Sequence, residues 1–473
     1  MSPANLFGPW KAMVRMVGIS VFFFIATGMG IAQDSQDAMD LDALFGDEPV
    51  VAQESSEESK IDPVASLTKT EGVRIGGLFS GSLSSAFTWN KLWDGSSPLF
   101  NPENRALTLG LGGTLFFDAR PEENFRVYGS AKTSWPFLRT DSGVSVPNLQ
   151  IFELFSDFSL DDRIFFRFGK STVKWGVGYF WSPADVINLE SINIFDAETP
   201  REGPVNFRVH LPLLGSQSNF YIYTILDSSD VKFETSALAA KAELLLGSYE
   251  LGLGGYYRYD TAERAMLTLT GPLGDLDIFG EAMVSRGSTK TFVDSILPTS
   301  PYTIATSDRG KNRAEYFFSA SAGFLYSNRD KNLSVIAQYF FNGEGYAPAL
   351  RDSLIADGKT AIANAGGPDS SLGKGLSAGL AGLLLGSGQH YAALNLSKGE
   401  VFGEDLSVSL LALANLSDLS GIVKPSLAWS VTENFSLTAS PTFFFGPEEG
   451  EYSFVAGGNI VTFTLGARLT GSF

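Results

Sequence analysis

The chain ends with VTFTLGARLTGSF at residues 461–473. Apolar side chains occupy alternate positions of this stretch, and mostly Thr, Arg and Ser lie between them. Successive side chains of a β-strand point to opposite faces, so the stretch predicts a strand with one apolar and one polar face. Phe463, Leu465, Leu469 and the terminal Phe473 share the apolar face.

The same period of two recurs back to Val73. Leu406, Val408 and Leu410 alternate with Ser407 and Ser409, for example. Across these segments the polar face is rich in Ser, Thr and Gly, whereas a solvated surface would carry Lys and Glu. A water-filled lumen suits such small polar residues, so we expect residues 73–473 to form a membrane-spanning β-barrel rather than a soluble sandwich.

Turns of alternating length join the predicted strands, as in hairpins that cross a membrane. We therefore expect an all-β, antiparallel up-and-down barrel of about 18 strands, with 16 as the alternative, short periplasmic turns and long external loops. Residues 347–364 and 376–386 are predicted to form helical segments within one external loop. The long loops are predicted at residues 91–104, 138–148, 173–204, 287–312 and 347–388.

The N-terminus has the pattern of an export signal. Lys11 and Arg15 precede an apolar stretch, and Gly30 and Ala32 fit the small-residue cleavage site. We expect residues 1–32 to be a signal peptide cut after Ala32, although a retained anchor helix is an alternative. Residues 33–72 are acidic, Ser-rich and poor in aromatic residues, which predicts a disordered periplasmic segment.

A final amphipathic strand that ends in Phe resembles the C-terminal signal of bacterial outer-membrane proteins. The resemblance implies that the barrel-insertion machinery recognises the strand through Phe463, Leu465, Leu469 and Phe473, by adding it to an open sheet edge. Together with the export signal, it predicts that the protein lies in the outer membrane of a diderm bacterium.

Several function classes are disfavoured by composition. The chain has no Cys, only two His and a net charge of -18, without a stripe of clustered Lys and Arg. Disulfides and thiolate metal sites are excluded, and nucleic-acid binding is not expected. We assemble no pair of nucleophile and base, so we predict neither an enzyme nor a metal site or cofactor.

Charged side chains on the polar phase are the candidate selectivity residues. Lipid-facing Lys or Arg at mid-depth would cost about 2 to 4 kcal/mol each, so a charged phase is expected to meet water or a partner charge. Two interpretations have similar weight: these residues filter solutes, or they form salt bridges that stiffen the wall. The candidates are Arg126, Lys132, Glu153, Asp157, Arg167, Arg208, Arg258 and Glu281, with His210 as a further lumen-facing residue.

The densest motif runs from Arg167 to Glu202, where Gly-Lys and Trp-Gly lead into SPADVIN at residues 182–188. This stretch resembles the strand-then-loop element of alginate-export-like and related Gram-negative porins. The resemblance implies a loop that folds inward and narrows the pore, with Asp185 and Asn188 capping turns and Arg201 and Glu202 near the lumen. For the loop aromatics we favour a membrane-interface girdle; these are Trp175, Tyr179, Phe180 and Trp181.

The function that these patterns favour is a porin-like channel for passive diffusion of small hydrophilic solutes, narrowed by residues 173–203. A hydrophobic-substrate transporter of the fatty-acid type ranks second, because the predicted lumen phase is polar. A surface adhesin or scaffold that uses the external loops is the third alternative. The expected partners are the lipid bilayer, the insertion machinery and the solutes, and the monomer or homo-oligomer question stays open.

Overall fold

The computed structural model describes residues 72–90, 100–122, 124–141, 144–161, 163–188, 192, 201–213, 216–226, 231–297, 303–307, 315–367, 370–402, 405–456 and 458–473. The predicted export signal and acidic segment fall outside these ranges, except for Gly72 at the end of the latter.

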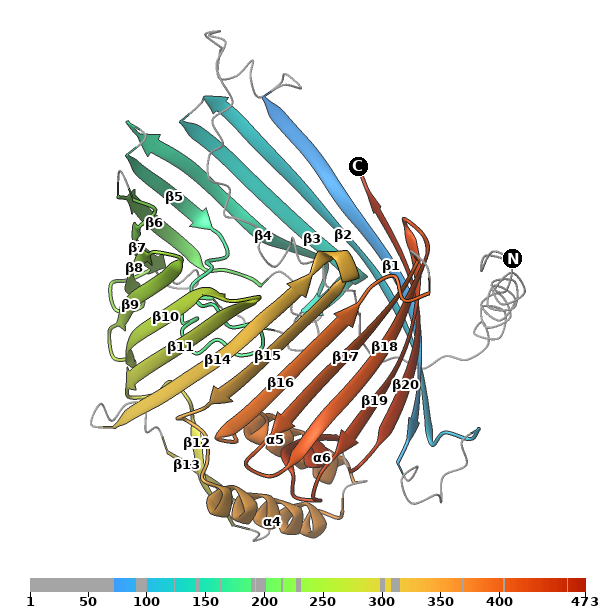
Figure 1. The fold of residues 1–473 in the computed structure, drawn as a ribbon. Helices are drawn as coiled ribbons and strands as arrows, with labels where there is room; N and C mark the ends of the chain where they lie inside the picture. The colour runs from blue at the N-terminus through green and yellow to red at the C-terminus, as the bar shows by residue number, and fades with distance from the viewer. Residues whose placement is uncertain are drawn as a thin grey trace.

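Eighteen of the described strands form one antiparallel sheet that closes into a barrel (Figure 1). Each strand pairs with the next barrel strand along the chain, which confirms the up-and-down topology and the prediction of 18 strands. The barrel strands are β1 (Val73–Trp89), β2 (Asn104–Glu122), β3 (Phe125–Asp141), β4 (Val144–Leu160), β5 (Ile164–Lys170), β6 (Val205–Pro212), β7 (Asn219–Leu226), β8 (Ala237–Leu246), β9 (Tyr249–Arg258), β10 (Glu263–Leu273), β11 (Leu276–Arg286), β14 (Tyr316–Asn328), β15 (Leu333–Phe341), β16 (His390–Lys398), β17 (Leu406–Asn415), β18 (Ser420–Thr432), β19 (Phe435–Phe445) and β20 (Val461–Ser472).

The barrel closes where the last strand pairs with the first. Leu83 of β1 lies opposite Ala467 of β20, and the register continues to Leu78 and Ser472. Beyond it, the amide of Phe473 donates to the carbonyl of Gly77 at 3.1 Å, and the amide of Gly77 donates back to the carbonyl of Phe473 at 3.1 Å. Closure satisfies the backbone groups that an open sheet edge would leave unpaired.

The outer face of the barrel is apolar, as the alternation predicts. Stacked rings lie on it where β4, β5 and β6 pair, with centroids 4.7 Å apart for Phe158 and Phe166 and 6.0 Å apart for Phe166 and Phe207. Such a face is stable in a bilayer and costly in water. Large apolar side chains that it leaves exposed include Leu109, Leu115, Ile151, Leu154, Leu253, Leu267 and Phe318.

Short turns join the strands at the end of the barrel where β1 begins and β20 ends, which we call the terminal end (Figure 1). The opposite end is the loop end. The long loop predicted at residues 138–148 is wrong. After an irregularity between Thr133 and Leu138, β3 and β4 resume pairing as far as Asp141 opposite Val144. The hairpin thus continues past the bulge instead of ending there.

Helices and a small hairpin complete the loop end. The hairpin consists of β12 (Phe292–Leu297) and β13 (Thr303–Ser307), and the helices are α4 (Pro348–Asn364), α5 (Ser371–Leu384) and α6 (Glu451–Ala456). Both helical segments predicted between β15 and β16 are therefore confirmed. A 3-10 turn, η3 (Arg329–Lys331), joins β14 to β15. Within the described residues, no helix is both long and apolar enough to span a bilayer.

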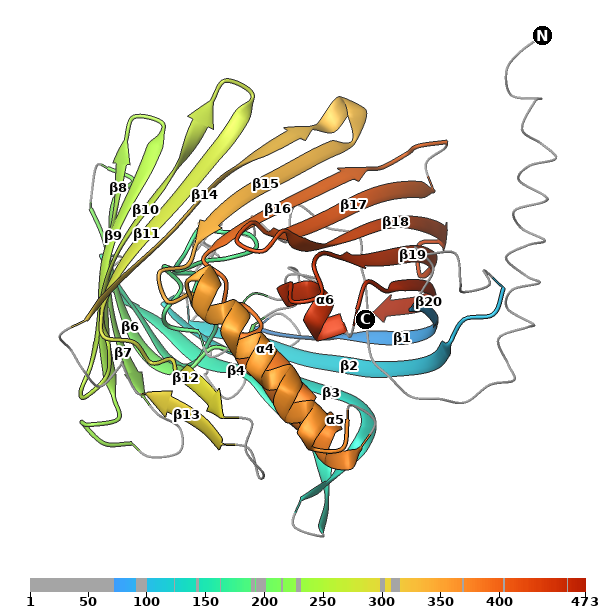
Figure 2. The same ribbon diagram turned by 90° about the horizontal axis from the view of Figure 1, so that it is seen from below.

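The elements of the loop end share a buried core that also includes Phe317 of the barrel strand β14. Phe292 and Ile296 of β12 contact Leu354 and Ile355 of α4 and Leu380 of α5, and all five side chains are buried. Figure 2, which views the barrel from this end, shows α4, α5 and α6 across its mouth. We call β12 and β13 together with α4 and α5 the cover.

Candidate functional site

Described residues of the connection between β5 and β6 fold into the barrel and bind its inner wall. Glu281, which the alternation of β11 directs into the lumen, is the main anchor and is buried. Its Oε2 accepts hydrogen bonds from the amide of Ala184 at 2.9 Å and from Oγ of Ser182 at 3.1 Å. Its Oε1 accepts from the amides of Gly178, at 2.5 Å, and Val177.

One carboxylate therefore satisfies three backbone amides and a hydroxyl of a loop about 100 residues away in the chain. Close approach of the loop backbone needs glycine here. A Cβ added to Gly176 would lie 2.8 Å from Oε1 of Glu281, and one added to Gly178 would lie 2.1 Å from the carbonyl oxygen of Trp181. The Trp-Gly run of the sequence is thus explained by backbone packing.

Gln338 of β15 is a second anchor. Its Oε1 accepts from the amides of Tyr179 at 3.1 Å and Phe180 at 2.8 Å, while its Nε2 donates to the carbonyl of Trp181 at 2.5 Å. The side-chain amide uses both its donor and its acceptor, as a peptide group would. Glu281 and Gln338 together hold residues 177–184, which we call the anchored loop, along the wall.

The loop aromatics lie inside the barrel, so the girdle predicted for them is wrong. Trp175 packs in a buried cluster with Tyr223 and Met266, and Lys241 of β8 donates to its carbonyl at 3.0 Å. Phe180 packs against the inner wall of β14 to β18, with Tyr179 and Trp181 at the edge of that cluster. The inner wall is apolar at these positions, which gives the rings a drier site than the membrane interface.

Exposed tyrosines at the loop end of the barrel stand where a girdle belongs. Tyr257, Tyr316 and Tyr339 are all exposed near strand ends on the outer face. An amphipathic ring there can place its apolar body in lipid and its hydroxyl toward the headgroups.

The base of the loop is closed by charge pairs among the predicted residues. Asp185 forms an ion pair with Arg201 and accepts a 2.9 Å hydrogen bond from Nδ2 of Asn188. Oδ1 of Asn188 in turn accepts from the amide of Val173 at 3.0 Å, so Asn188 joins two parts of the connection that lie 15 residues apart. Glu202 forms an ion pair with Lys170 of β5.

Arginines form a row on the inner wall near the terminal end. Arg126 of β3 lies between two carboxylates: its Nε donates to Asp118 at 2.8 Å, and its Nη1 lies 3.7 Å from Asp157. Arg167 of β5 donates to Asp157 through Nε at 2.7 Å, and Arg208 of β6 lies opposite Arg167 in the register.

Asp118 is also within 3.6 Å of Arg74 and Arg120. The arginine row therefore comprises five guanidinium groups and two carboxylates and is net positive; its arginines are Arg74, Arg120, Arg126, Arg167 and Arg208.

The remaining predicted residues have other contacts. Lys132 stands 3.4 Å above the ring centroid of Phe152, and Glu153 accepts from the amide of Thr172 at 3.3 Å. His210 contacts Asn219 at 2.9 Å and its ring is stacked on Tyr221. Arg258 ends β9 opposite Ala237.

Small hydroxyl side chains line another part of the inner wall, on β20, β1 and β2. We call it the hydroxyl sector, and the anchoring contacts above involve none of its strands. Each of its side chains is partly exposed, so solvent reaches it. Its members are Ser80, Ser82, Ser84, Thr108, Thr114, Thr462, Thr464 and Thr470.

Two important residues were missed in the sequence. Asp118 falls on the polar phase of β2, directly after Phe117 of the apolar phase, and could have been included with the charged candidates. Gln338 gave a weaker signal, a single amide among the apolar residues of β15. Its role depends on the loop between β5 and β6, and no local pattern specifies that partner.

No family model and no curated protein sequence matches the chain. Among solved structures, OccAB1 of Acinetobacter baumannii has a TM-score of 0.45 and 11% identity over 84% of this chain and 97% of that one. OccK11 (OpdR) of Pseudomonas aeruginosa has a TM-score of 0.46 and 8% identity over 84% and 96%. Salmonella typhi OmpF, in a complex with daunomycin, has a TM-score of 0.38 and 10% identity over 83% and 97%. These three structures do not show the alginate-export resemblance of the loop.

Proposed function

We propose that this chain is a porin-like channel through which small hydrophilic solutes diffuse passively, and that the loop of residues 173–203 narrows its lumen. The observation that carries the proposal is the attachment of the loop to one side of the inner wall by Glu281 and Gln338. A loop held in this way restricts the lumen without sealing it, because the contacts of its described residues leave the hydroxyl sector uncovered.

The chemistry of the wall supports hydrophilic rather than apolar solutes. Hydroxyl groups of the hydroxyl sector can replace part of the hydration shell of a passing solute, and the arginine row adds charge on a neighbouring part of the wall. Apolar side chains of the inner wall, such as Leu325 and Ile336, are covered by Phe180 of the loop itself. A fatty-acid type transporter would need such surface to be open to its substrate.

We further propose that the barrel resides in the outer membrane of a diderm bacterium. The supporting observations are the apolar outer face, the closed seam between β1 and β20, and a final strand whose Phe463, Leu465 and Leu469 share the outer phase. The predicted signal peptide, cut after Ala32, would deliver the chain to the periplasm, where the insertion machinery would receive it.

Single-channel recording of the refolded full-length chain in a planar bilayer tests the proposal. Stepwise ohmic current is the expected result. Silence together with saturable fatty-acid binding would favour the hydrophobic-substrate alternative, and silence together with binding of a matrix or host protein would favour the adhesin. Separation of inner and outer membranes by density tests the location independently, since recovery in the inner membrane would contradict it.

A further inference from the structure

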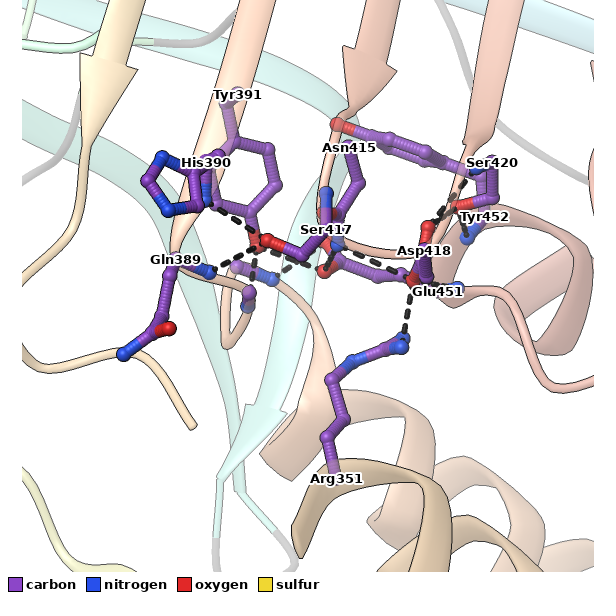
Figure 3. Close-up of polar contacts among 12 residues, drawn as sticks. Arg351, Gln389, His390, Tyr391, Asn415, Ser417, Asp418, Ser420, Glu451 and Tyr452 are labelled. Atoms are coloured by element: carbon purple, nitrogen blue, oxygen red, sulfur yellow. Dashed lines mark hydrogen bonds and ion pairs between the residues drawn. The ribbon is translucent and has the colours of Figure 1, made fainter. Parts of the chain in front are cut away.

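A buried polar cluster ties the cover to the barrel rim (Figure 3). Arg351 of α4, only 1% exposed, places Nη1 2.5 Å from Oδ2 of Asp418 in the turn between β17 and β18. The same Oδ2 accepts from the amide of Glu451, the first residue of α6, at 2.8 Å. We call Arg351, Asp418 and Glu451 the clasp.

The clasp also holds the far end of the cover. Oε1 of Glu451 accepts from the amide of Gly386, just after α5, at 2.9 Å. Its Oε2 accepts from the hydroxyl of Tyr391 on β16 at 2.7 Å and from Nδ2 of Asn415 on β17 at 2.8 Å. The carboxylate of Glu451 thus joins α6 to the end of the loop that follows α5 and to two barrel strands, while Asp418 holds α4 through Arg351.

Charge within the clasp is unbalanced. Nδ2 of Asn415 is within 3.2 Å of both Asp418 and Glu451, so the two carboxylates are close neighbours. Arg351 is the one cation of the clasp and forms its ion pair with Asp418. Two buried carboxylates beside one guanidinium repel each other when both are ionised, and uptake of one proton removes that repulsion.

We propose that the clasp is an acid-sensitive latch of the loop end, in which uptake of one proton by the paired carboxylates of Asp418 and Glu451 fastens the cover across the mouth of the channel. The proposal rests on the channel function proposed above. Fastening of the latch should lower the channel conductance in mildly acid medium relative to neutral pH, because a fastened cover restricts the entry of solutes at the mouth.

The sign of the effect follows from linkage. Burial raises the pKa of Glu451, and the charge of Asp418 adds to the rise; the Tyr391 hydroxyl, the Gly386 amide and Arg351 oppose it without cancelling it. A carboxyl whose pKa is higher in the fastened clasp than in the released one holds its proton more tightly when fastened. Fastening is therefore favoured as the pH falls through the raised pKa toward the ordinary value of 4.5.

Other titratable groups that face Glu451 do not reverse this sign. Tyr452 on α6 has its pKa raised by burial and by Glu451, so it stays neutral at mildly acid pH. The hydroxyl of Tyr391 keeps its proton as well, because it donates a hydrogen bond to Glu451. Lys290, which follows β11, is a further cation that interacts with Glu451, and burial lowers its pKa while Glu344 and Glu451 raise it. Its ordinary value of 10.5 lies far above mild acidity.

The test is a titration of single-channel conductance from about pH 8 to about pH 5 in the refolded full-length protein. We expect the mean conductance of the wild type to fall at least about twofold over this range. Glu451→Gln removes the titrating carboxylate, so its conductance should not depend on pH over this range. Asp352→Asn is the matched control, because it neutralises an exposed carboxylate next to Arg351 on the same helix and should titrate like the wild type.

A conductance that rises on acidification in the wild type, or a Glu451→Gln channel that titrates like the wild type, overturns the latch. If no variant conducts at any pH, the channel function fails instead, and hydrogen exchange then tests the latch separately. After correction for intrinsic rates, the amides of α4 should gain protection from neutral to mildly acid pH in the wild type and show no change in Glu451→Gln. Equal behaviour of the two proteins would contradict the proposal.

Discussion

The amide of Ala184 donates a hydrogen bond of 2.9 Å to Oε2 of Glu281, across 97 residues of sequence. This contact, repeated by Ser182 and Gly178, holds the anchored loop against the wall of β11. Hydrogen bonds to a buried charged group stabilise by about 1.5 to 3 kcal/mol each, so the position of the loop depends strongly on this one side chain.

Glu281→Ala should therefore release the anchored loop and raise the single-channel conductance, with larger current noise from a mobile loop. Glu281→Gln should act in the same direction, because its NH2 group meets backbone amides that need an acceptor. Asp277→Asn is the control, since it changes a lumen-phase carboxylate four residues earlier in β11 that forms no hydrogen bond with the described residues of the loop. Unchanged conductance in both Glu281 variants would contradict the anchoring role.

Gln338 allows a graded version of the same experiment. Gln338→Glu keeps an acceptor for the amides of Tyr179 and Phe180 but loses the donor to Trp181, while Gln338→Leu loses all three hydrogen bonds. We expect the uptake of neutral sugars by proteoliposomes to increase in the order wild type, Gln338→Glu, Gln338→Leu. A larger effect of Glu than of Leu would mean that charge in the lumen, and not release of the loop, controls uptake.

How far the sequence predicts this molecule depends on how local each signal is. The outward phase of residues such as Leu109 and Leu115 follows from alternation, and so do the strand number and the position of Glu281 on the inner wall. Phe180 and Trp181 were misassigned because aromatic residues beside a strand end are equally compatible with an interface girdle. Their true site needs the apolar inner face of β14 to β18, which is assembled from distant segments.

The clasp could not be predicted from the sequence for the same reason. Arg351 lies in a helix whose position was predicted, but its partner Asp418 is in a turn between two later strands. Neither residue has a periodic or motif signal, and only the folded loop end brings them together. Contacts between loops are therefore the part of this structure that pattern analysis does not reach.

Ion selectivity should respond oppositely to the two members of one salt bridge. Nε of Arg167 donates to Oδ1 of Asp157 at 2.7 Å in the arginine row. Asp157→Asn leaves the row more positive and should increase the permeability of anions relative to cations, whereas Arg167→Gln should decrease it. Reversal potentials across a salt gradient measure both, and Lys331→Gln in the exposed η3 turn serves as the control. Shifts of the same sign in the two variants would show that the row acts only by supporting the wall.

Assembly of the barrel should depend on the terminal residue. The amide and carbonyl of Phe473 form a reciprocal pair of 3.1 Å hydrogen bonds with Gly77, which extends the seam between β20 and β1 beyond Ser472. Removal of Phe473 leaves those groups of Gly77 without their partner at the point where the sheet closes. We expect less of the heat-modifiable, folded form on unheated gels and less protein in the outer-membrane fraction. Ser472→Ala keeps the backbone hydrogen bonds of the seam and should assemble like the wild type. An equal loss of the folded form in both variants would show that the backbone pairing of Phe473 with Gly77 does not control assembly.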